Sequence, residues 1–405
     1  MGDRLPAGIH FRSGESPPDH FRFLTFNFTP SATRAGARDA LAAIWIMLGE
    51  LRQGMVRDLA SSRPDDPEIR VDAGELTYLF SFGPKLFDPA GRQEALVDPA
   101  LRPDRLPALR PAPTGPFRSL RWSDTAQPQA AQTDFAIQLT GTGQLAVSRP
   151  IVEIQKLIDD AQLPVRMVCF YSGIHRDDRR SWIDFHDGIN NMPSDERRQA
   201  IEIADSAHAW LNGGTTIAFL KIAIDLQGWR RLARDKQEAL VGRDKLSGCP
   251  IERITAGPDG ALTLQRAPCP PNSEIDSSWP GEARDPPAPG DLLATASHIH
   301  RANLLRQPPA TDAANRIYRQ GYEFVDSPPD GGVRVGLNFV SFQRDPIALL
   351  NILRSAGWMG DANFGGIAGD PAVPAFPLMS LVAGGLFAVP PVDGPFPGHS
   401  LFGER

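Results

Sequence analysis

Three short segments of this 405-residue chain hold side chains that could do chemistry. The first is SWIDFHDGINNM, residues 181–192, in which Asp187 follows Trp, Phe and His rings. A carboxylate among rings is costly to bury unless it is paired or has a raised pKa. Such a group can accept and donate a proton near neutral pH. In isolation, Asp-Gly followed by Asn-Asn also fits an ordinary turn, so this segment predicts either a catalytic acid–base group or a turn.

The second segment is ATASHIHRANLLRQ, residues 294–307, which holds His298 and His300 next to Arg301. A neutral imidazole is a common iron ligand. Side chains two residues apart on a helix point in different directions, so both histidines would not normally bind one ion. A structural or surface pair of histidines is the alternative interpretation of this pattern.

The third segment is NRIYRQGYEF, residues 315–324, with Arg319 directly before Gln-Gly. Arginine is always charged and presents a fixed fork of donors, which suits the polarisation of a peroxide or a carboxylate. Arg316 and Arg319 could instead be surface residues three apart on a short helix. The sequence contains no HExxH, GxSxG or GxxxxGK[ST] motif, and GTGQLA at 141–146 lacks the third glycine of a dinucleotide-binding turn.

The elements that would position these segments follow one order twice. In the first half the patterns predict strands at 20–28, 75–83 and 134–141, and helices at 37–54 and 148–161, the last with Ser148 as its N-cap. In the second half they predict strands at 215–226, 322–325 and 336–343, and helices at 227–242 and 345–357. Each half is therefore β-α-β-β-α, which is the order of a ferredoxin-like unit with its last strand missing or hidden.

Two such units packed together fit the length of the chain. The expected fold class is α+β, with one ferredoxin-like unit over residues 1–165 and a second over residues 166–405. A chance agreement between two short patterns is the alternative.

The composition also bears on nucleic-acid binding, on membrane insertion and location, and on the state of the cysteines. The formal net charge is −6 and no basic run resembles a nucleic-acid-binding arm, so neither DNA nor RNA is expected. No apolar stretch reaches the length of a membrane span, and MGDRLPAGIH has no export signal, so a cytoplasmic location is expected. The three cysteines are scattered without a CxxC pair, which favours reduced thiols over a zinc site or a disulfide framework.

Taken together, FHDG, SHIHRAN and RIYRQGY resemble the dye-decolourising (DyP-type) haem peroxidases in their order and approximate spacing. The resemblance extends to three further blocks, at residues 76–88, 211–250 and 336–346. The chain departs from the family pattern at Asp184, which replaces the first glycine of the GxxDG motif. It also departs at Leu220, where an arginine is frequent.

The resemblance implies a pair of ferredoxin-like units, with haem b bound in the C-terminal one. It assigns the iron to His298, in preference to His300. It places Asp187 and Arg319 on the opposite, peroxide-binding side of the haem as the catalytic residues.

The resemblance also implies the surroundings of the haem. Leu337 and Phe339, two apart on one strand face, would line the peroxide side of the pocket. Asp345 would hydrogen-bond the iron-ligating imidazole, which would strengthen that ligand. Arg301, three residues after the ligand, is the remaining candidate for haem binding.

The implied activity is reduction of hydrogen peroxide coupled to one-electron oxidation of organic reductants such as dyes and phenolics. Two alternatives stay open: a haem enzyme of the same fold specialised for one oxidation in a biosynthetic pathway, and a non-catalytic haem-binding protein. The expected partners are hydrogen peroxide and a small organic reductant, with no nucleic acid and no membrane. A homo-oligomer is compatible with the sequence.

Overall fold

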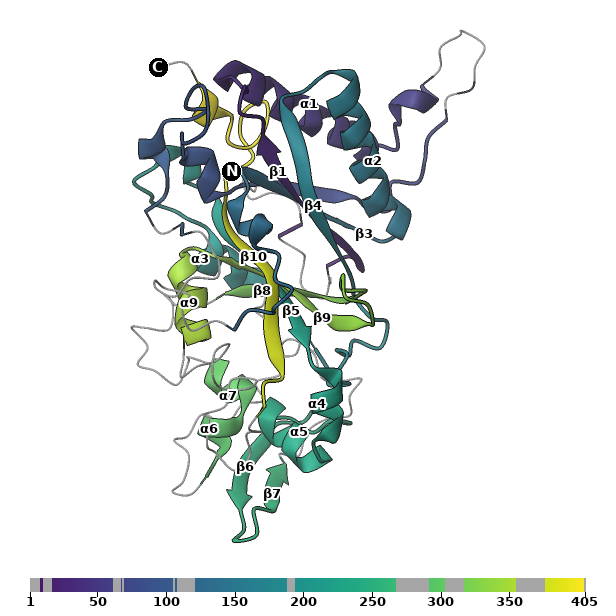
Figure 1. The fold of residues 1–405 in the computed structure, drawn as a ribbon, viewed down its shortest axis with the longest axis vertical. Coiled ribbons are helices and arrows are strands. Elements are labelled where there is room, and N and C mark those ends of the chain that lie inside the picture. Colours follow the sequence, from purple (N-terminus) through teal and green to yellow (C-terminus); the bar gives the residue numbers. More distant parts are fainter. Residues whose placement is uncertain are drawn as a thin grey trace.

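A computed structural model of the chain describes residues 8–9, 17–60, 67, 69–104, 106–107, 121–187, 194–266, 291–302, 317–354 and 376–403. Within these residues, strands close into a barrel in the order β1-β3-β2-β10-β5-β9-β8-β4 (Figure 1). Helices lie outside the barrel, and a separate two-stranded hairpin, β6-β7, extends from one end of the molecule.

The elements follow one another in two similar sets. The first set consists of β1 (His20–Phe28), α1 (Arg34–Arg52), β2 (Thr77–Phe82), β3 (Phe135–Gly141), α2 (Gln144–Asp160) and β4 (Val165–Ile174). The second set consists of β5 (Thr215–Ile224), α4 (Leu226–Arg231), α5 (Arg234–Val241), β8 (Tyr318–Asp326), β9 (Arg334–Gln343), α9 (Pro346–Arg354) and β10 (Met379–Val389). The remaining elements are α3 (Ser194–Ile201), β6 (Ile251–Ala256), β7 (Leu262–Arg266), α6 (Leu293–Ala296) and α7 (His298–Ala302).

Each set forms a complete ferredoxin-like sheet, with the orders β4-β1-β3-β2 and β10-β5-β9-β8. The patterns in the sequence had left out both fourth strands. β4 pairs antiparallel along the length of β1 and is therefore the last strand of the first unit. The boundary at residue 165 expected from the sequence would separate this strand from its unit. We propose that the division between the units falls after Ile174.

Aromatic side chains explain why the strands close around one core. Phe21 and Phe23 alternate on β1 and point into the barrel, as expected for residues two apart on a strand. Phe21 stacks on Tyr322 of β8 with ring centroids 4.4 Å apart, and Phe23 stacks on Phe219 of β5 at 4.5 Å. The first unit therefore fills the barrel directly behind the strands of the second unit.

Two predicted helices differ from the structure. α2 begins at Gln144 with Gly143 as its N-cap, so Ser148 lies inside the helix and is not the cap. The Ser148 hydroxyl instead accepts a hydrogen bond from the Arg22 guanidinium at 3.2 Å. The helix expected over 227–242 is divided into α4 and α5, because Leu232 and Ala233 between them are extended.

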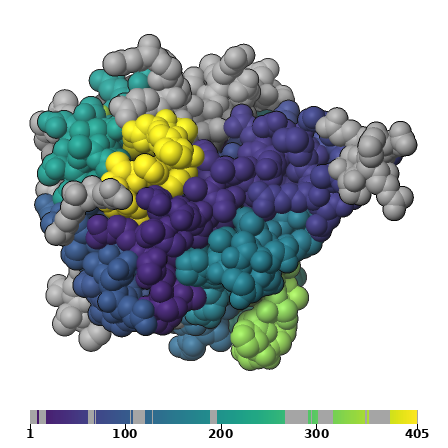
Figure 2. Space-filling view, turned by 90° about the horizontal axis from the view of Figure 1, so that it is seen from above, coloured from purple at the N-terminus to yellow at the C-terminus, as the bar shows by residue number. Residues whose placement is uncertain are grey.

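The C-terminal segment returns to the first unit. The helical turn His399–Phe402 contacts α1, and the Phe402 ring lies 6.2 Å from that of Phe82 on β2. Figure 2 shows this yellow segment beside the purple N-terminal residues.

Cys249 is disulfide-bonded, which corrects the expectation of three reduced thiols; its partner lies outside the described residues, and Cys169 is free. Among the helices that the structure describes, none combines the length and apolar character needed to cross a membrane.

Candidate functional site

The outer face of β8 carries most of the candidate site. Arg319, Gly321 and Glu323 alternate on this face, while the residues between them fill the barrel. In the antiparallel register, Phe339 of β9 lies opposite Gly321, and Leu337 lies opposite Glu323. Residues directly opposite on paired strands share a face, so two charged side chains and two half-buried apolar side chains meet here.

Asp187 reaches this face at Gly321. A Cβ placed on Gly321 would lie 3.3 Å from Oδ2 of Asp187 and 3.1 Å from Cδ1 of Leu337. The Asp187 carboxylate therefore lies in the notch that the missing side chain leaves, between the positions of Arg319 and Glu323 along the strand. Its side chain is exposed in the protein alone. The structure thus brings together the two predicted catalytic residues and the two predicted lining residues.

A tight turn delivers Asp187 to the notch. Ile183 and Phe185 are buried and anchor the turn in a cluster with Trp229. Asp184 between them has φ 66°, in the left-handed region that glycine favours and aspartate tolerates. Asp184 therefore keeps the backbone conformation at the position where the family motif has glycine.

Glu323 is a site residue that the sequence patterns had not indicated. Its side chain is buried, and burial together with the nearby Asp187 carboxylate raises its pKa from 4.5 to about 8. Oε2 accepts a hydrogen bond from the Trp182 backbone N–H at 3.3 Å. Oε1 is buried without a hydrogen-bond partner among the described residues. The signal was present in the spacing, since residues four apart on a strand share a face.

His175 is a second residue that the patterns had not indicated. Its ring stacks on Tyr322 with centroids 4.3 Å apart, just behind the notch. Burial lowers the pKa of His175, and the Asp187 carboxylate opposes that shift. His175 Nδ1 also lies 4.0 Å from the exposed Asp19 carboxylate.

The two histidines of α7 have different surroundings. His300 is buried, with Nδ1 2.8 Å from the Ser297 hydroxyl, so its ring is held inside the protein. His298 is half-buried at the start of the helix. This difference supports His298 as the histidine that could bind an external group.

α9 connects α7 to the barrel. α7 contacts α9, and α9 contacts β5 and β9 (Figure 1). Leu349 of α9 belongs to the same apolar cluster as Leu220 of β5, with Phe339 packed against it. Because Leu220 and Phe339 are register partners on the outer face, α9 and α7 lie on the side of the sheet that also presents Arg319.

The remaining predicted site residues are Asp345 and Arg301. Oδ1 of Asp345 accepts a hydrogen bond from the Ile347 backbone N–H at 2.9 Å, at the start of α9. This contact caps the helix, and the hydrogen bond from an imidazole N–H to the Asp345 carboxylate stays a prediction. The backbone of Arg301 lies in α7, but its side chain is outside the described residues.

The site contains the kinds of side chain that a haem pocket uses. Among the described residues, no group of three or more His, Cys, Asp or Glu side chains could hold a metal ion. A haem requires only an axial ligand such as imidazole, with the polarity of the opposite side set by a few residues. His298 offers the imidazole, Leu337 and Phe339 offer apolar surface, and Asp187 and Arg319 offer the polar groups.

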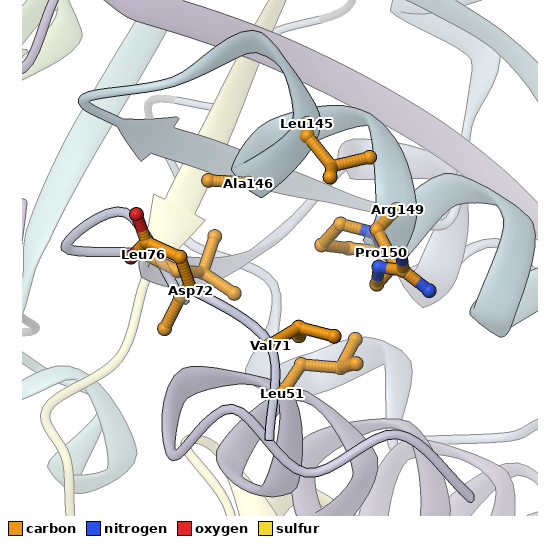
Figure 3. A pocket seen from close by; sticks show the side chains of 9 residues that line it. Leu51, Val71, Asp72, Leu76, Leu145, Ala146, Arg149 and Pro150 are labelled. Atoms are coloured by element: carbon orange, nitrogen blue, oxygen red, sulfur yellow. The ribbon is translucent and has the colours of Figure 1, made fainter. Parts of the chain in front are cut away.

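A separate small pocket lies in the first unit, between the end of α1 and the start of α2 (Figure 3). Its lining is mostly apolar and consists of Leu51, Val71, Asp72, Ala73, Leu76, Leu145, Ala146, Arg149 and Pro150. None of the predicted site residues lines this pocket, so it is distinct from the candidate site.

Comparisons with known proteins find relatives in one family. Residues 178–394 match the family model described as Dyp-type peroxidase, C-terminal. The dye-decolorizing peroxidase of Thermobifida fusca is 27% identical over 183 residues, which are 44% of this chain and 37% of that protein. A deferrochelatase of Escherichia coli (strain K12) is 26% identical over 169 residues, 40% of this chain and 34% of that protein. The match thus spans little more than a third of each curated relative.

Solved structures share the fold over nearly the full chain. Ferric DtpA from Streptomyces lividans aligns with a TM-score of 0.68 at 21% identity, covering 98% of this chain and 97% of that one. A DyP-type peroxidase from Cellulomonas bogoriensis aligns with a TM-score of 0.66 at 19% identity, covering 100% of both chains. A variant of DypB from Rhodococcus jostii, solved in complex with heme, aligns with a TM-score of 0.58 at 16% identity over 95% of this chain and 96% of that one. The family match over more than half of the sequence and the paired ferredoxin-like sheets lead to one conclusion: this chain belongs to the DyP-type peroxidase family.

Proposed function

We propose that this protein is a haem-dependent peroxidase that reduces hydrogen peroxide and oxidises organic reductants, such as dyes and phenolics, in one-electron steps. The observation that carries the proposal is the Asp187 carboxylate in the Gly321 notch, on the strand face of Arg319. A proton acceptor and a fixed positive charge on one apolar surface are the groups that peroxide cleavage requires.

His298 would hold haem b, and Leu337, Phe339 and Arg301 are the further residues that we propose to bind it. When bound, haem supplies a redox-active iron that exchanges electrons with peroxide and with organic reductants. Asp345 is proposed to hydrogen-bond the imidazole, through the oxygen that does not cap α9.

The chain's own groups would manage protons and charge. Asp187 would accept a proton from one oxygen of the peroxide and return it to the other oxygen, which would leave as water. Arg319 stabilises the negative charge that develops as the O–O bond breaks. Leu337 and Phe339 limit the access of water, which strengthens these electrostatic interactions.

Substitution of the two polar residues tests this function. Asp187→Asn keeps the size of the side chain but cannot accept a proton, so the reaction with peroxide should slow by about 10²–10⁴-fold, the usual range for general acid–base catalysis. Arg319→Leu should retain haem and slow the same step by about 10²–10³-fold. Stopped-flow absorption of the haem measures both rates.

The control is Asp184→Asn, which alters an exposed aspartate of the same turn. It should react at the wild-type rate, since asparagine also tolerates positive φ. Because neighbouring charged groups act non-additively, the Asp187→Asn, Arg319→Leu double variant belongs in the series. Full activity in that double variant would contradict the proposed mechanism.

Leu220 favours a second candidate function, a haem enzyme of the same family specialised for one oxidation. It is buried on the outer face of β5, where the family often has an arginine, so this wall of the site is apolar. Turnover of a panel of unrelated dyes and phenols separates the two functions. Broad turnover supports the general peroxidase, and peroxide-dependent activity on one narrow class of reductant supports the specialised enzyme.

A further inference from the structure

Glu323 lies on the same outer face of β8 as Arg319 and Gly321. Successive outward residues on a strand are about 7 Å apart, so Arg319 and Glu323 lie on either side of Gly321. The Asp187 carboxylate occupies the space above Gly321. The Asp187 carboxylate therefore lies between the strand positions of Arg319 and Glu323.

The charged groups around Glu323 leave it without a counter-ion. Asp187, Asp178 and Arg176 are the groups whose charges affect it. Arg176 is engaged elsewhere, since it pairs with Asp178 at 2.6 Å and lies 4.8 Å above the Trp182 ring. No salt bridge to Glu323 exists within the described part of the chain, where its one hydrogen bond comes from the Trp182 N–H.

Burial of Glu323 and the neighbouring Asp187 carboxylate together favour a proton bound to Glu323. A pKa of about 8 leaves Glu323 protonated at neutral pH. His175, whose pKa the Asp187 carboxylate affects, stacks on Tyr322, and burial favours its neutral form. Glu323 is thus the proton-bearing member of the pair, and Asp187 is the member exposed toward the substrate side.

We propose that Glu323 is a second acid of the site, which carries a proton and passes it to Asp187 during turnover. This inference rests on the proposed peroxidase function. Reduction of one hydrogen peroxide to two waters consumes two electrons and two protons, and electrons taken from a remote reductant arrive without protons. The proton moves from the Glu323 carboxyl to the Asp187 carboxylate, Asp187 donates it to oxygen, and water then reprotonates Glu323.

The test is Glu323→Gln in the haem-loaded protein. Glutamine keeps the size of the side chain and still accepts the Trp182 N–H, but it cannot release a proton. Steady-state kcat at pH 7 should fall by about 10²-fold, the lower end of the range for acid–base catalysis. The wild-type profile should lose activity above a pH of about 8, and the variant should lack that alkaline limb. The matched control is Glu153→Gln, a buried glutamate of α2 paired with Lys156, which should leave kcat and its pH profile unchanged.

Infrared titration gives a readout that does not depend on activity. The carbonyl stretch of a protonated carboxyl group should be present at neutral pH, disappear near pH 8 in the wild type, and be absent in Glu323→Gln. In Asp187→Asn its midpoint should move to lower pH, because a neighbouring negative charge has been removed. An active wild type with an unchanged Glu323→Gln variant, or without this band, overturns the role of Glu323. An inactive wild type that shows the band overturns the peroxidase function instead.

Discussion

The sequence alone leaves two interpretations of the Asp187 segment, a catalytic group or a turn. Residues 181–187 turn sharply in the structure, and this turn holds the Asp187 carboxylate against β8. Buried neighbours anchor the turn, and Asp184 adopts its left-handed conformation. The turn therefore positions the carboxylate that we propose as the catalytic proton acceptor.

Glu323 should make the stability of the protein depend on pH. Its pKa in the folded protein is about 8, above the ordinary value of 4.5, so the folded state binds this proton more tightly than the unfolded state does. The free energy of unfolding therefore falls as pH rises from about 4.5 to about 8. Because one pKa unit corresponds to about 1.4 kcal/mol, the loss amounts to a few kcal/mol after allowance for partial solvation.

The measurement is the melting temperature of wild type and Glu323→Gln between pH 4.5 and 9. The melting temperature of the variant should equal that of the wild type near pH 4.5. As pH rises toward 8, the variant should become progressively more stable than the wild type. A difference in melting temperature between the two proteins that does not change with pH would contradict the claim that folded Glu323 holds a proton at neutral pH.

At the scale of elements, alternating aromatic residues made most strands predictable, including β1 and β3. The fourth strands were harder. Phe170 and Ile174 on β4 are exposed at 50% and 39%, which blurs the alternation, and β10 contains two glycines within a continuous apolar run. The sequence pattern also began β8 at residue 322, whereas the strand begins at Tyr318. Because the expected strand lacked residues 318–321, the sequence pattern did not place Arg319 and Glu323 on one face of the same strand.

The end of α5 controls the position of α7. Gly242 has φ 90°, and a Cβ there would lie 2.0 Å from Oγ of Ser297 and 2.7 Å from Cγ1 of Ile299. These two residues flank His298, so Gly242→Ala should displace the predicted iron ligand. We expect a destabilisation of about 1–3 kcal/mol from overpacking and backbone strain, together with a clear loss of haem affinity in a haem titration.

Gly260→Ala separates strain from displacement. Gly260, in the turn between β6 and β7, also has positive φ, but no atom of the described residues lies within 4 Å of a Cβ at this position. This variant should lose stability through strain alone and bind haem as the wild type does. Equal haem affinities of the two alanine variants would mean that α7 does not carry the ligand.

At the scale of the whole molecule, the two units depend on each other. The candidate site lies outside the second sheet, while aromatic rings of β1 pack behind β8 inside the barrel. The barrel closes through the bridges between Ile174 and Glu323 and between Phe82 and Ala388. The duplication was visible in the sequence, but closure was not, because it depends on pairing between residues far apart in the chain.

The disulfide at Cys249 bears on where the molecule works. Disulfides persist mainly in oxidising compartments, and the cytoplasmic location expected from the sequence stays a prediction. In a thiol titration of the denatured, unreduced protein, one of the three cysteines should react, and all three should react after reduction. Three reactive thiols before reduction would contradict the disulfide.

The central claim, that this chain binds haem through His298 and uses it on peroxide, is tested most directly by absorption spectroscopy. The purified protein is reconstituted with haem, and its spectrum is recorded before and after one equivalent of hydrogen peroxide. We predict a haem band that changes on mixing and returns when a phenol or dye is added. His298→Ala should lose the band, and His300→Ala should keep it, because only the first histidine is predicted to bind iron. A wild-type protein without a haem band, or with a band that peroxide leaves unchanged, would contradict the account.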